Sequence, residues 1–76
     1  MIYWLSPVPE KCETCDAPIG EKFYDAATDS VTGPWACICP TCFTLGPGIG
    51  KLGLGLGQEY TRTQVGDKIR YVKTGG

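Results

Sequence analysis

The stretch WACICPTCF, residues 35–43, contains three of the chain's five cysteines and includes the C-x-x-C motif of Cys39 and Cys42. A second C-x-x-C motif, formed by Cys12 and Cys15, lies 23 residues upstream. Each motif lets two sulfur atoms converge on one ion, so two motifs can complete the tetrahedral, four-thiolate shell of a structural metal site. The spacing therefore predicts that Cys12, Cys15, Cys39 and Cys42 hold one metal ion.

Zinc is the predicted cofactor, as one structural Zn²⁺, and iron is the alternative because four thiolates suit both metals. The fifth cysteine, Cys37, would share a strand face with Trp35 and Cys39. It is therefore either a spare ligand or a small buried apolar residue.

The length of the chain also points to a cross-link, because a domain of 76 residues buries too little surface to depend on its core alone. An odd number of cysteines argues against a fully paired disulfide framework. The first residues, MIYWLSP, have neither the basic region nor the apolar length of a signal peptide. We expect a single domain, residues 1–76, in a reducing cytoplasm where thiols serve as metal ligands.

The residues between the two cysteine pairs have the pattern of a β-hairpin. Phe23 and Tyr24 lie in a strand-like run, turn residues follow, and residues 31–38 are typical of a returning strand. Each cysteine pair would then lie at the base of one arm of the hairpin. No helix is predicted anywhere in the chain.

The second half of the chain has two further segments. Residues 46–57, GPGIGKLGLGLG, contain six glycines, which disfavours a helix and predicts an extended segment with Leu52, Leu54 and Leu56 on one face. Residues 59–74 surround the turn-like sequence Val-Gly-Asp-Lys and predict a C-terminal β-hairpin.

The cysteine motifs resemble those of zinc ribbons and of rubredoxin-like proteins, whose second knuckle often reads Cys-Pro-x-Cys, as residues 39–42 do. The resemblance covers residues 12–43 and implies a small metal-stabilised all-β fold with a zinc-ribbon-like hairpin as its core. Trp35, Phe23 and Tyr24 would pack beside the metal site. The sequence departs from the rubredoxin pattern at Asp16 and Phe43, where a glycine commonly follows each knuckle.

A second resemblance concerns GPWACICPTCF, residues 33–43, followed by GLGLGQEY, residues 53–60. This run is similar to one found in small, mostly uncharacterised proteins of tailed bacteriophages. The resemblance implies a phage-encoded protein that acts in the cytoplasm of a bacterial host cell or forms part of the virion.

Charge is distributed unevenly although the net charge is only −1. Two lysines against six carboxylates leave residues 1–38 at −4, whereas five cations against two carboxylates leave residues 39–76 at +3. The C-terminal hairpin combines cations with aromatic rings, as a nucleic-acid surface does, and its candidate contacts are Tyr60, Arg62, Lys68, Arg70, Tyr71 and Lys73. The alternative is an ordinary solvated strand face with its aromatic residues in the core.

Catalysis has little support in the sequence. The chain has no histidine, and four cysteine ligands leave a metal no open position for water. Residues 48–53 match G-x-G-x-x-G, but this chain has no room for the βαβ unit that a dinucleotide site requires. We therefore expect no enzymatic activity, no small-molecule substrate and no membrane span.

Three functions follow from these features, in order of preference. The first is a non-enzymatic, zinc-binding interaction module that binds a host or phage protein, or its own copies, through the apolar residues 2–5 and the Gly/Leu segment. The second is a zinc-ribbon nucleic-acid-binding protein that uses the C-terminal hairpin. The third is a rubredoxin-like electron carrier.

Overall fold

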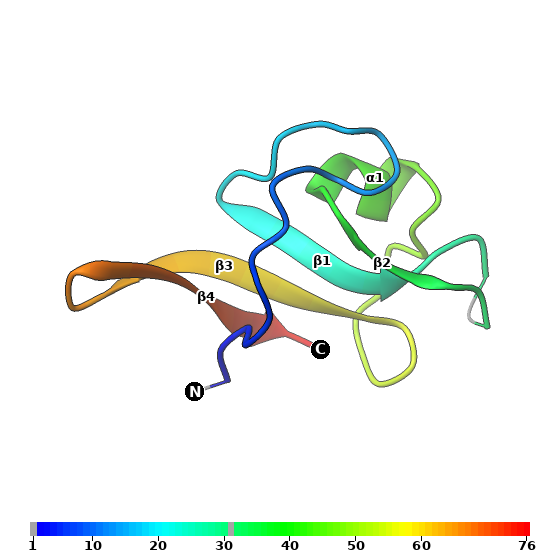
Figure 1. Cartoon of the computed structure of the whole chain (residues 1–76). Coiled ribbons are helices and arrows are strands. Elements are labelled where there is room, and N and C mark those ends of the chain that lie inside the picture. The colour runs from blue at the N-terminus through cyan, green and yellow to red at the C-terminus, as the bar shows by residue number, and fades with distance from the viewer. Residues whose placement is uncertain (1, 31) are drawn as a thin grey trace.

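The computed structural model describes residues 2–30 and 32–76, which fold around one antiparallel sheet of four strands (Figure 1). The strands are β1 (Lys22–Ala27), β2 (Trp35–Ile38), β3 (Gly57–Val65) and β4 (Lys68–Gly75), and their order in the sheet is β2-β1-β3-β4. Both predicted hairpins are present, and the small all-β fold is confirmed. The sequence did not indicate that β1 and β3 pair and so join the two hairpins into one sheet.

The first hairpin has a shorter returning strand than residues 31–38 predict. Its register pairs Tyr24 with Ile38 and ends at the pair of Ala27 and Trp35. Before Trp35, the backbone carbonyl of Pro34 accepts hydrogen bonds from the amide and the hydroxyl of Thr28, at 2.9 and 2.8 Å. These bonds hold a loop rather than a strand, and Val31 lies outside the described residues.

One short helix, α1 (Pro40–Leu45), follows β2 and was not predicted. Cys39 caps its N-terminus with an extended backbone, and its sulfur accepts a hydrogen bond from the amide of Cys42 at 3.5 Å. Proline suits the first helical position because its missing amide needs no partner there. The helix ends at Gly46, whose amide donates to the carbonyl of Cys42.

The glycine-rich segment is irregular rather than extended along its whole length. It bridges to Thr28 at Gly48 and then turns tightly between Gly53 and Gly57. Gly53 and Gly55 have φ values of 137° and 78°, which residues with a Cβ rarely adopt. The turn leaves Leu54 96% exposed while Leu56 is half-buried, so the leucines do not share one face.

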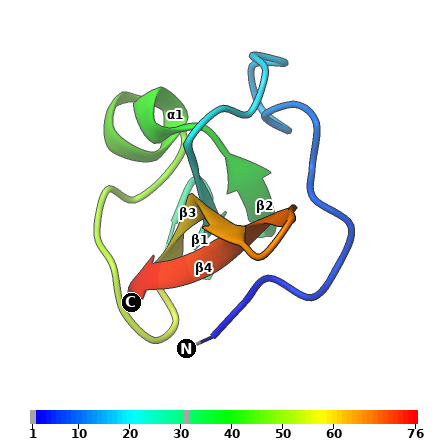
Figure 2. The same ribbon diagram turned by 90° about the vertical axis from the view of Figure 1, so that its left-hand side faces the viewer.

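The sheet has an apolar cluster on each face. On the first face, Tyr24, Ala26 and Ile38 meet α1 and the cysteines. On the opposite face, Phe23, Tyr60 and Tyr71 pack together under Trp4. The end-on view of Figure 2 shows α1 above the sheet and the N-terminal segment running from the β4 edge up toward the first cysteine pair.

The apolar N-terminal residues are partly docked onto the sheet. The amide of Trp4 donates to the carbonyl of Tyr71 at 2.8 Å, and the amide of Lys73 donates to the carbonyl of Ile2 at 2.7 Å. The Trp4 ring meets Phe23 and Tyr60 edge to face, with ring centroids 5.3 and 5.2 Å apart. This segment therefore closes the outer edge of β4 and covers the aromatic cluster.

Candidate metal centre

The four predicted ligands lie together at one end of the first hairpin. The sulfur atoms of Cys12, Cys15, Cys39 and Cys42 are all within 4.8 Å of one another. A tetrahedral zinc site with Zn–S bonds of about 2.3 Å would separate neighbouring sulfurs by about 3.8 Å. The sulfurs of Cys15 and Cys39 are 3.7 Å apart, so the cluster fits one ion with little adjustment.

The first cysteine pair is held by a tight turn. The amide of Asp16 donates to the carbonyl of Cys12 at 2.9 Å, and the amide of Cys12 donates to the carbonyl of Ala17 at 2.8 Å. Asp16 has a φ of 63°, in the left-handed region where glycine is usual. This backbone would suit glycine better than the aspartate that the chain has there.

Two hydrogen bonds fix this turn against the edge of β2. The amide of Glu13 donates to the carbonyl of Cys37 at 3.0 Å, and the amide of Cys37 donates to the Oε2 atom of Glu13. The turn carrying Cys12 and Cys15 is thereby tied to the strand that leads into Cys39 and Cys42. Nothing in the sequence indicates this role for Glu13, because an acid between two cysteines is compatible with any exposed turn.

The second cysteine pair is built differently, at the start of α1. Cys39 is the cap and Cys42 lies in the first turn, so helical geometry points both sulfurs the same way. Phe43 follows in the helix, is 5% exposed and stacks on Tyr24 with a centroid distance of 4.0 Å and an interplanar angle of 2°. A glycine is therefore not needed after Cys42, which explains the departure at Phe43.

Two thiols of the cluster have pKa values that are shifted in opposite directions. Burial acts to raise the pKa of Cys12, but hydrogen bonds from the Thr14 hydroxyl and from the amides of Cys39, Thr14 and Cys15 outweigh it and bring the pKa to about 6. For Cys15 the Ala17 amide acts to lower the pKa, but bonds with the other three thiols raise it to about 12. A metal ion replaces these shared protons, since it binds thiolates and releases protons on binding.

Cys37 is outside the cluster. It alternates with Ile38 and lies half-buried on the opposite face of the sheet, packed against the aromatic cluster. Burial raises the pKa of the Cys37 thiol to about 11, and the nearby carboxylates of Asp25 and Glu13 add to the effect. The thiol is neutral in this position and acts as a small apolar residue, not as a ligand.

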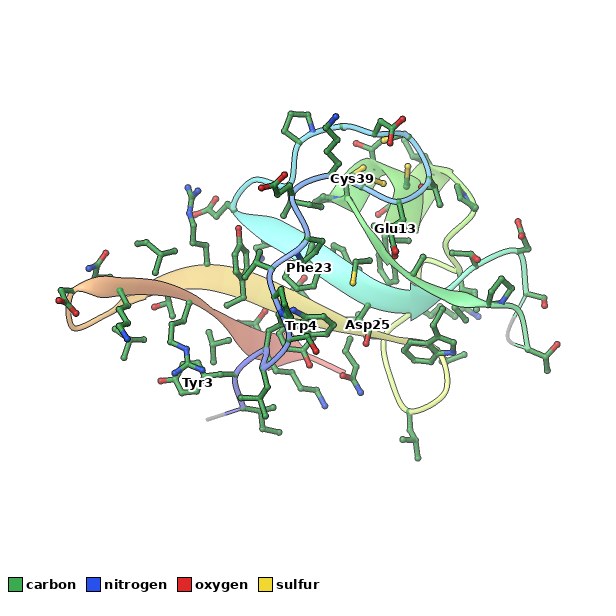
Figure 3. All side chains as sticks on the ribbon, viewed as in Figure 1. Tyr3, Trp4, Glu13, Phe23, Asp25 and Cys39 are labelled. Atoms are coloured by element: carbon green, nitrogen blue, oxygen red, sulfur yellow. The ribbon has the colours of Figure 1, made fainter. Side chains whose placement is uncertain are left out.

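The aromatic residues expected beside the metal site are only partly there. Tyr24 packs against the cysteine cluster, but Phe23 alternates with it along β1 and points to the opposite face. Trp35 is 42% exposed and contributes little to either cluster. Figure 3 shows Phe23 near Trp4, well below Cys39.

The candidate residues of the C-terminal hairpin divide into two groups. Tyr60 and Tyr71 are each 6% exposed, so neither ring offers a free face for a nucleic-acid base, and that part of the expectation is corrected. Arg62 and Lys68 are exposed, whereas Arg70 and Lys73 are half-buried. The guanidinium of Arg70 lies 4.6 Å from the ring centroid of Tyr3, a contact that the sequence did not predict.

The fold and the cluster define a small, metal-stabilised all-β protein with a four-cysteine site. Family models, curated proteins and solved structures were compared with the chain, and none of them matched it. No helix among the described residues is long and apolar enough to cross a membrane.

Proposed function

We propose that the chain is a non-enzymatic, zinc-stabilised interaction module that binds a protein partner through exposed apolar side chains. The four-cysteine cluster is the observation that carries the proposal. Four thiolates fill a tetrahedral shell, so the ion organises the fold and has no open position for a substrate. Under this proposal the protein acts in the bacterial host cell or in the virion, as the phage resemblance implies.

The binding surface is assigned to the glycine-rich turn and the residues near it. The amides of Leu56 and Gly57 both donate to the carbonyl of Gly53, at 3.0 and 3.1 Å, so the turn is internally bonded. Leu54 stands at its apex almost fully exposed to solvent. Burial of a leucine side chain is worth about 1.5 to 3 kcal/mol, so a partner that covers Leu54 gains affinity without reshaping the turn.

Native mass spectrometry of the untagged protein, purified without chelator, is the first experiment. The expected mass is one chain plus one zinc ion, and the same spectrum gives the number of chains in the assembly. An iron ion in place of zinc would favour the electron-carrier alternative, and a visible absorption band would accompany it. A metal-free folded chain would overturn the proposal.

The partner is tested by capture from lysate of a bacterial host after nuclease treatment. We expect Leu54→Ser to lose the captured protein while the exposed polar control Gln64→Ser retains it. A defined oligomer in the mass spectrum, abolished by Leu54→Ser, would instead identify the partner as a second copy of the chain. Equal capture by wild type and both variants would contradict the assignment of Leu54.

Nucleic-acid binding is retained as a second candidate because of the cations of the C-terminal hairpin. Arg62, Lys68, Arg70 and Lys73 outnumber its single acid, Asp67, within residues 60–73. The hairpin is a different surface from the glycine-rich turn, so the two candidates can be tested separately.

A further inference from the structure

The β3–β4 hairpin extends beyond the rest of the sheet as a two-stranded ribbon. β1 pairs with β3 from Gly57 to Thr61, and the Arg62 amide donates to the carbonyl of Glu21, just before β1, at 2.7 Å. The N-terminal segment bonds to β4 at Tyr71 and Lys73. Between these contacts and the turn at Gly66, the described residues include no third strand. Figure 1 shows the ribbon projecting past the end of β1.

The ribbon is basic, and carboxylates do not neutralise it. Among the described residues, Lys22 and Glu59 form an ion pair at 3.6 Å, which involves none of the hairpin cations. Asp67 at the turn is the only acid between Tyr60 and Lys73. A protruding element with an excess of three positive charges attracts a polyanion.

The register places these cations on both faces of the ribbon. Arg62 lies opposite Tyr71, and Lys73 lies opposite Tyr60, so both cations are on the side of the aromatic cluster. Arg70 lies opposite Thr63 and Lys68 opposite Val65, so these two cations are on the other side. Paired residues of an antiparallel ladder share a face, which makes this division a consequence of the register.

This distribution fits a duplex groove better than a single strand. A single sheet layer with its side chains is about 10 Å thick, and the DNA major groove is about 12 Å wide and admits a two-stranded ribbon. Cations on both faces would then meet the phosphates on both walls of the groove. Single strands are held by stacking on exposed rings, and the rings of Tyr60 and Tyr71 are buried.

We propose that the β3–β4 ribbon is a sequence-independent binding element for double-stranded DNA, which enters a groove and contacts both phosphate backbones. Arg62 and Lys73, the latter at the base of the ribbon where β4 pairs with Tyr60, contact one wall, and Lys68 and Arg70 contact the other. Two threonine side chains, Thr61 and Thr74, lie at the base of the ribbon with their hydroxyls 2.8 Å apart. The Thr74 side chain is exposed. The acidic, metal-bearing half of the chain stays away from the DNA.

The test is fluorescence anisotropy of a labelled 20-base-pair duplex of mixed sequence with the metal-loaded, full-length protein. Four neutralised phosphates predict that log Kobs falls with log salt with a slope of about −3 to −4. Lys68→Gln and Arg62→Gln, one from each face, are each expected to reduce the slope by about 0.9, and the double variant to reduce it by about twice as much. The exposed Lys51, outside the ribbon, supplies the matched control Lys51→Gln, which should leave the slope unchanged.

Several results would overturn the proposal. These are no binding at 20 mM salt, equal binding of the separated single strands, and a loss in Lys51→Gln as large as in Lys68→Gln. An effect of Lys68 without an effect of Arg62 would exclude contact with two walls. Displacement of the duplex by poly-glutamate as effectively as by unlabelled duplex would identify the ribbon as a site for an acidic protein. Metal content and near-ultraviolet circular dichroism verify that each variant is folded.

Discussion

At the scale of single residues, Asp16 is one of two described non-glycine residues with a positive φ, the other being Asp29. The Asp16 φ of 63° closes the turn that presents Cys12 and Cys15, but a Cβ is unfavourable in that region. Asp tolerates the left-handed conformation better than most residues, and glycine adopts it freely. Replacing Asp16 with glycine should therefore stabilise the turn.

We expect Asp16→Gly to raise the free energy of unfolding of the zinc-loaded protein by up to about 1 kcal/mol, because the left-handed penalty is removed. Denaturant unfolding measures the change. Glu21→Gly is the control: it removes the same charge from an exposed residue without a positive φ, and glycine there should be neutral or destabilising. A loss of stability in Asp16→Gly would show that the Asp16 side chain is worth more than the strain.

Cys37 and Cys39 are two positions apart in the chain, but only Cys39 belongs to the four-cysteine cluster, whereas Cys37 packs against the aromatic cluster. Cys39→Ser removes a ligand and the sulfur that caps α1, so we expect a largely unfolded chain with no bound zinc. Cys37→Ser is expected to keep one zinc and a dispersed NMR spectrum, with a modest loss of stability from a polar group on the aromatic face. A well-dispersed spectrum from metal-free Cys39→Ser would contradict this assignment.

The sequence identified the four clustered cysteines because two C-x-x-C pairs that bracket a predicted hairpin rarely occur without a metal. It could not assign Cys37, since the face of a residue depends on where the strand ends and the helix begins. It also left open whether Tyr60 and Tyr71 were surface rings or core residues, because the sequence of a hairpin does not show which of its faces is buried. The pairing of β3 with β1, which is distant in the sequence, determines which face of the hairpin is buried.

At the scale of secondary-structure elements, α1 is too short to be stable alone. Isolated helices need more than 12 residues or so, and α1 has six. Its stability comes from the Cys39 cap, from the metal-ligand pair and from the stack of Phe43 on Tyr24. The sequence did not predict this helix, because a segment of fewer than two turns is too short to show hydrophobic periodicity.

Phe43→Ala is expected to lower the free energy of unfolding by about 3 kcal/mol or more, since it leaves a cavity under Tyr24. Leu45→Ala, in the same helix, removes a side chain that is 83% exposed and should change stability by less than about 0.5 kcal/mol. Thermal unfolding of the two zinc-loaded variants gives the comparison. Similar losses in both would show that the packing of Phe43 on Tyr24 is not what stabilises this element, because alanine has a higher helix propensity than either residue it replaces.

A polar network joins β1, β3 and β4 on the face of the cysteine site. The Tyr24 hydroxyl and the Thr74 hydroxyl donate to the two carboxylate oxygens of Glu59, each at 2.7 Å. Hydrogen bonds from Tyr24 and Thr74, with the charge of Lys22, lower the pKa of Glu59 despite partial burial. Burial, together with Glu59, raises the pKa of Tyr24 to about 12.

Because the folded state favours the neutral phenol, Tyr24 contributes stability that is fully present below about pH 10 and is lost as the pH rises through about 12. We expect Glu59→Gln to lower the pKa of Tyr24, although burial keeps it above the usual value. Absorbance titration of the phenols in wild type, Glu59→Gln and Tyr24→Phe isolates this residue. An unchanged titration curve in Glu59→Gln would mean that burial alone sets the shift.

At the scale of the whole molecule, the metal site and the aromatic cluster are on opposite faces of one thin sheet. β1 contributes Tyr24 to one face and Phe23 to the other, so the two clusters share a backbone. The sequence predicted the number of hairpins but not this arrangement, since neither hairpin specifies a partner for its outer strand. We expect the molecule to unfold as one cooperative unit.

Removal of the metal tests that cooperativity. A strong chelator should abolish the near-ultraviolet circular dichroism and shift the emission of Trp4 to longer wavelength, although Trp4 packs on the face away from the cysteines. The emission is measured in Trp35→Phe, so that Trp4 is the only tryptophan. Retention of the Trp4 signal after the zinc is gone would show that β1, β3 and β4 fold without the metal.

Both outer edges of the sheet are closed over part of their length. The N-terminal segment bonds to β4 at Tyr71 and Lys73, and Glu13 bonds to β2 at Cys37. An open strand edge is a template on which further chains can add, so this closure protects a concentrated solution from aggregation. The β4 edge is closed by backbone pairing alone, but the β2 edge is closed by a turn that the metal holds in place. Because we expect loss of the metal to unfold the chain as one unit, storage in chelating buffer would uncover both edges, the WACI strand included, and promote aggregation. Zinc in the buffer would prevent it.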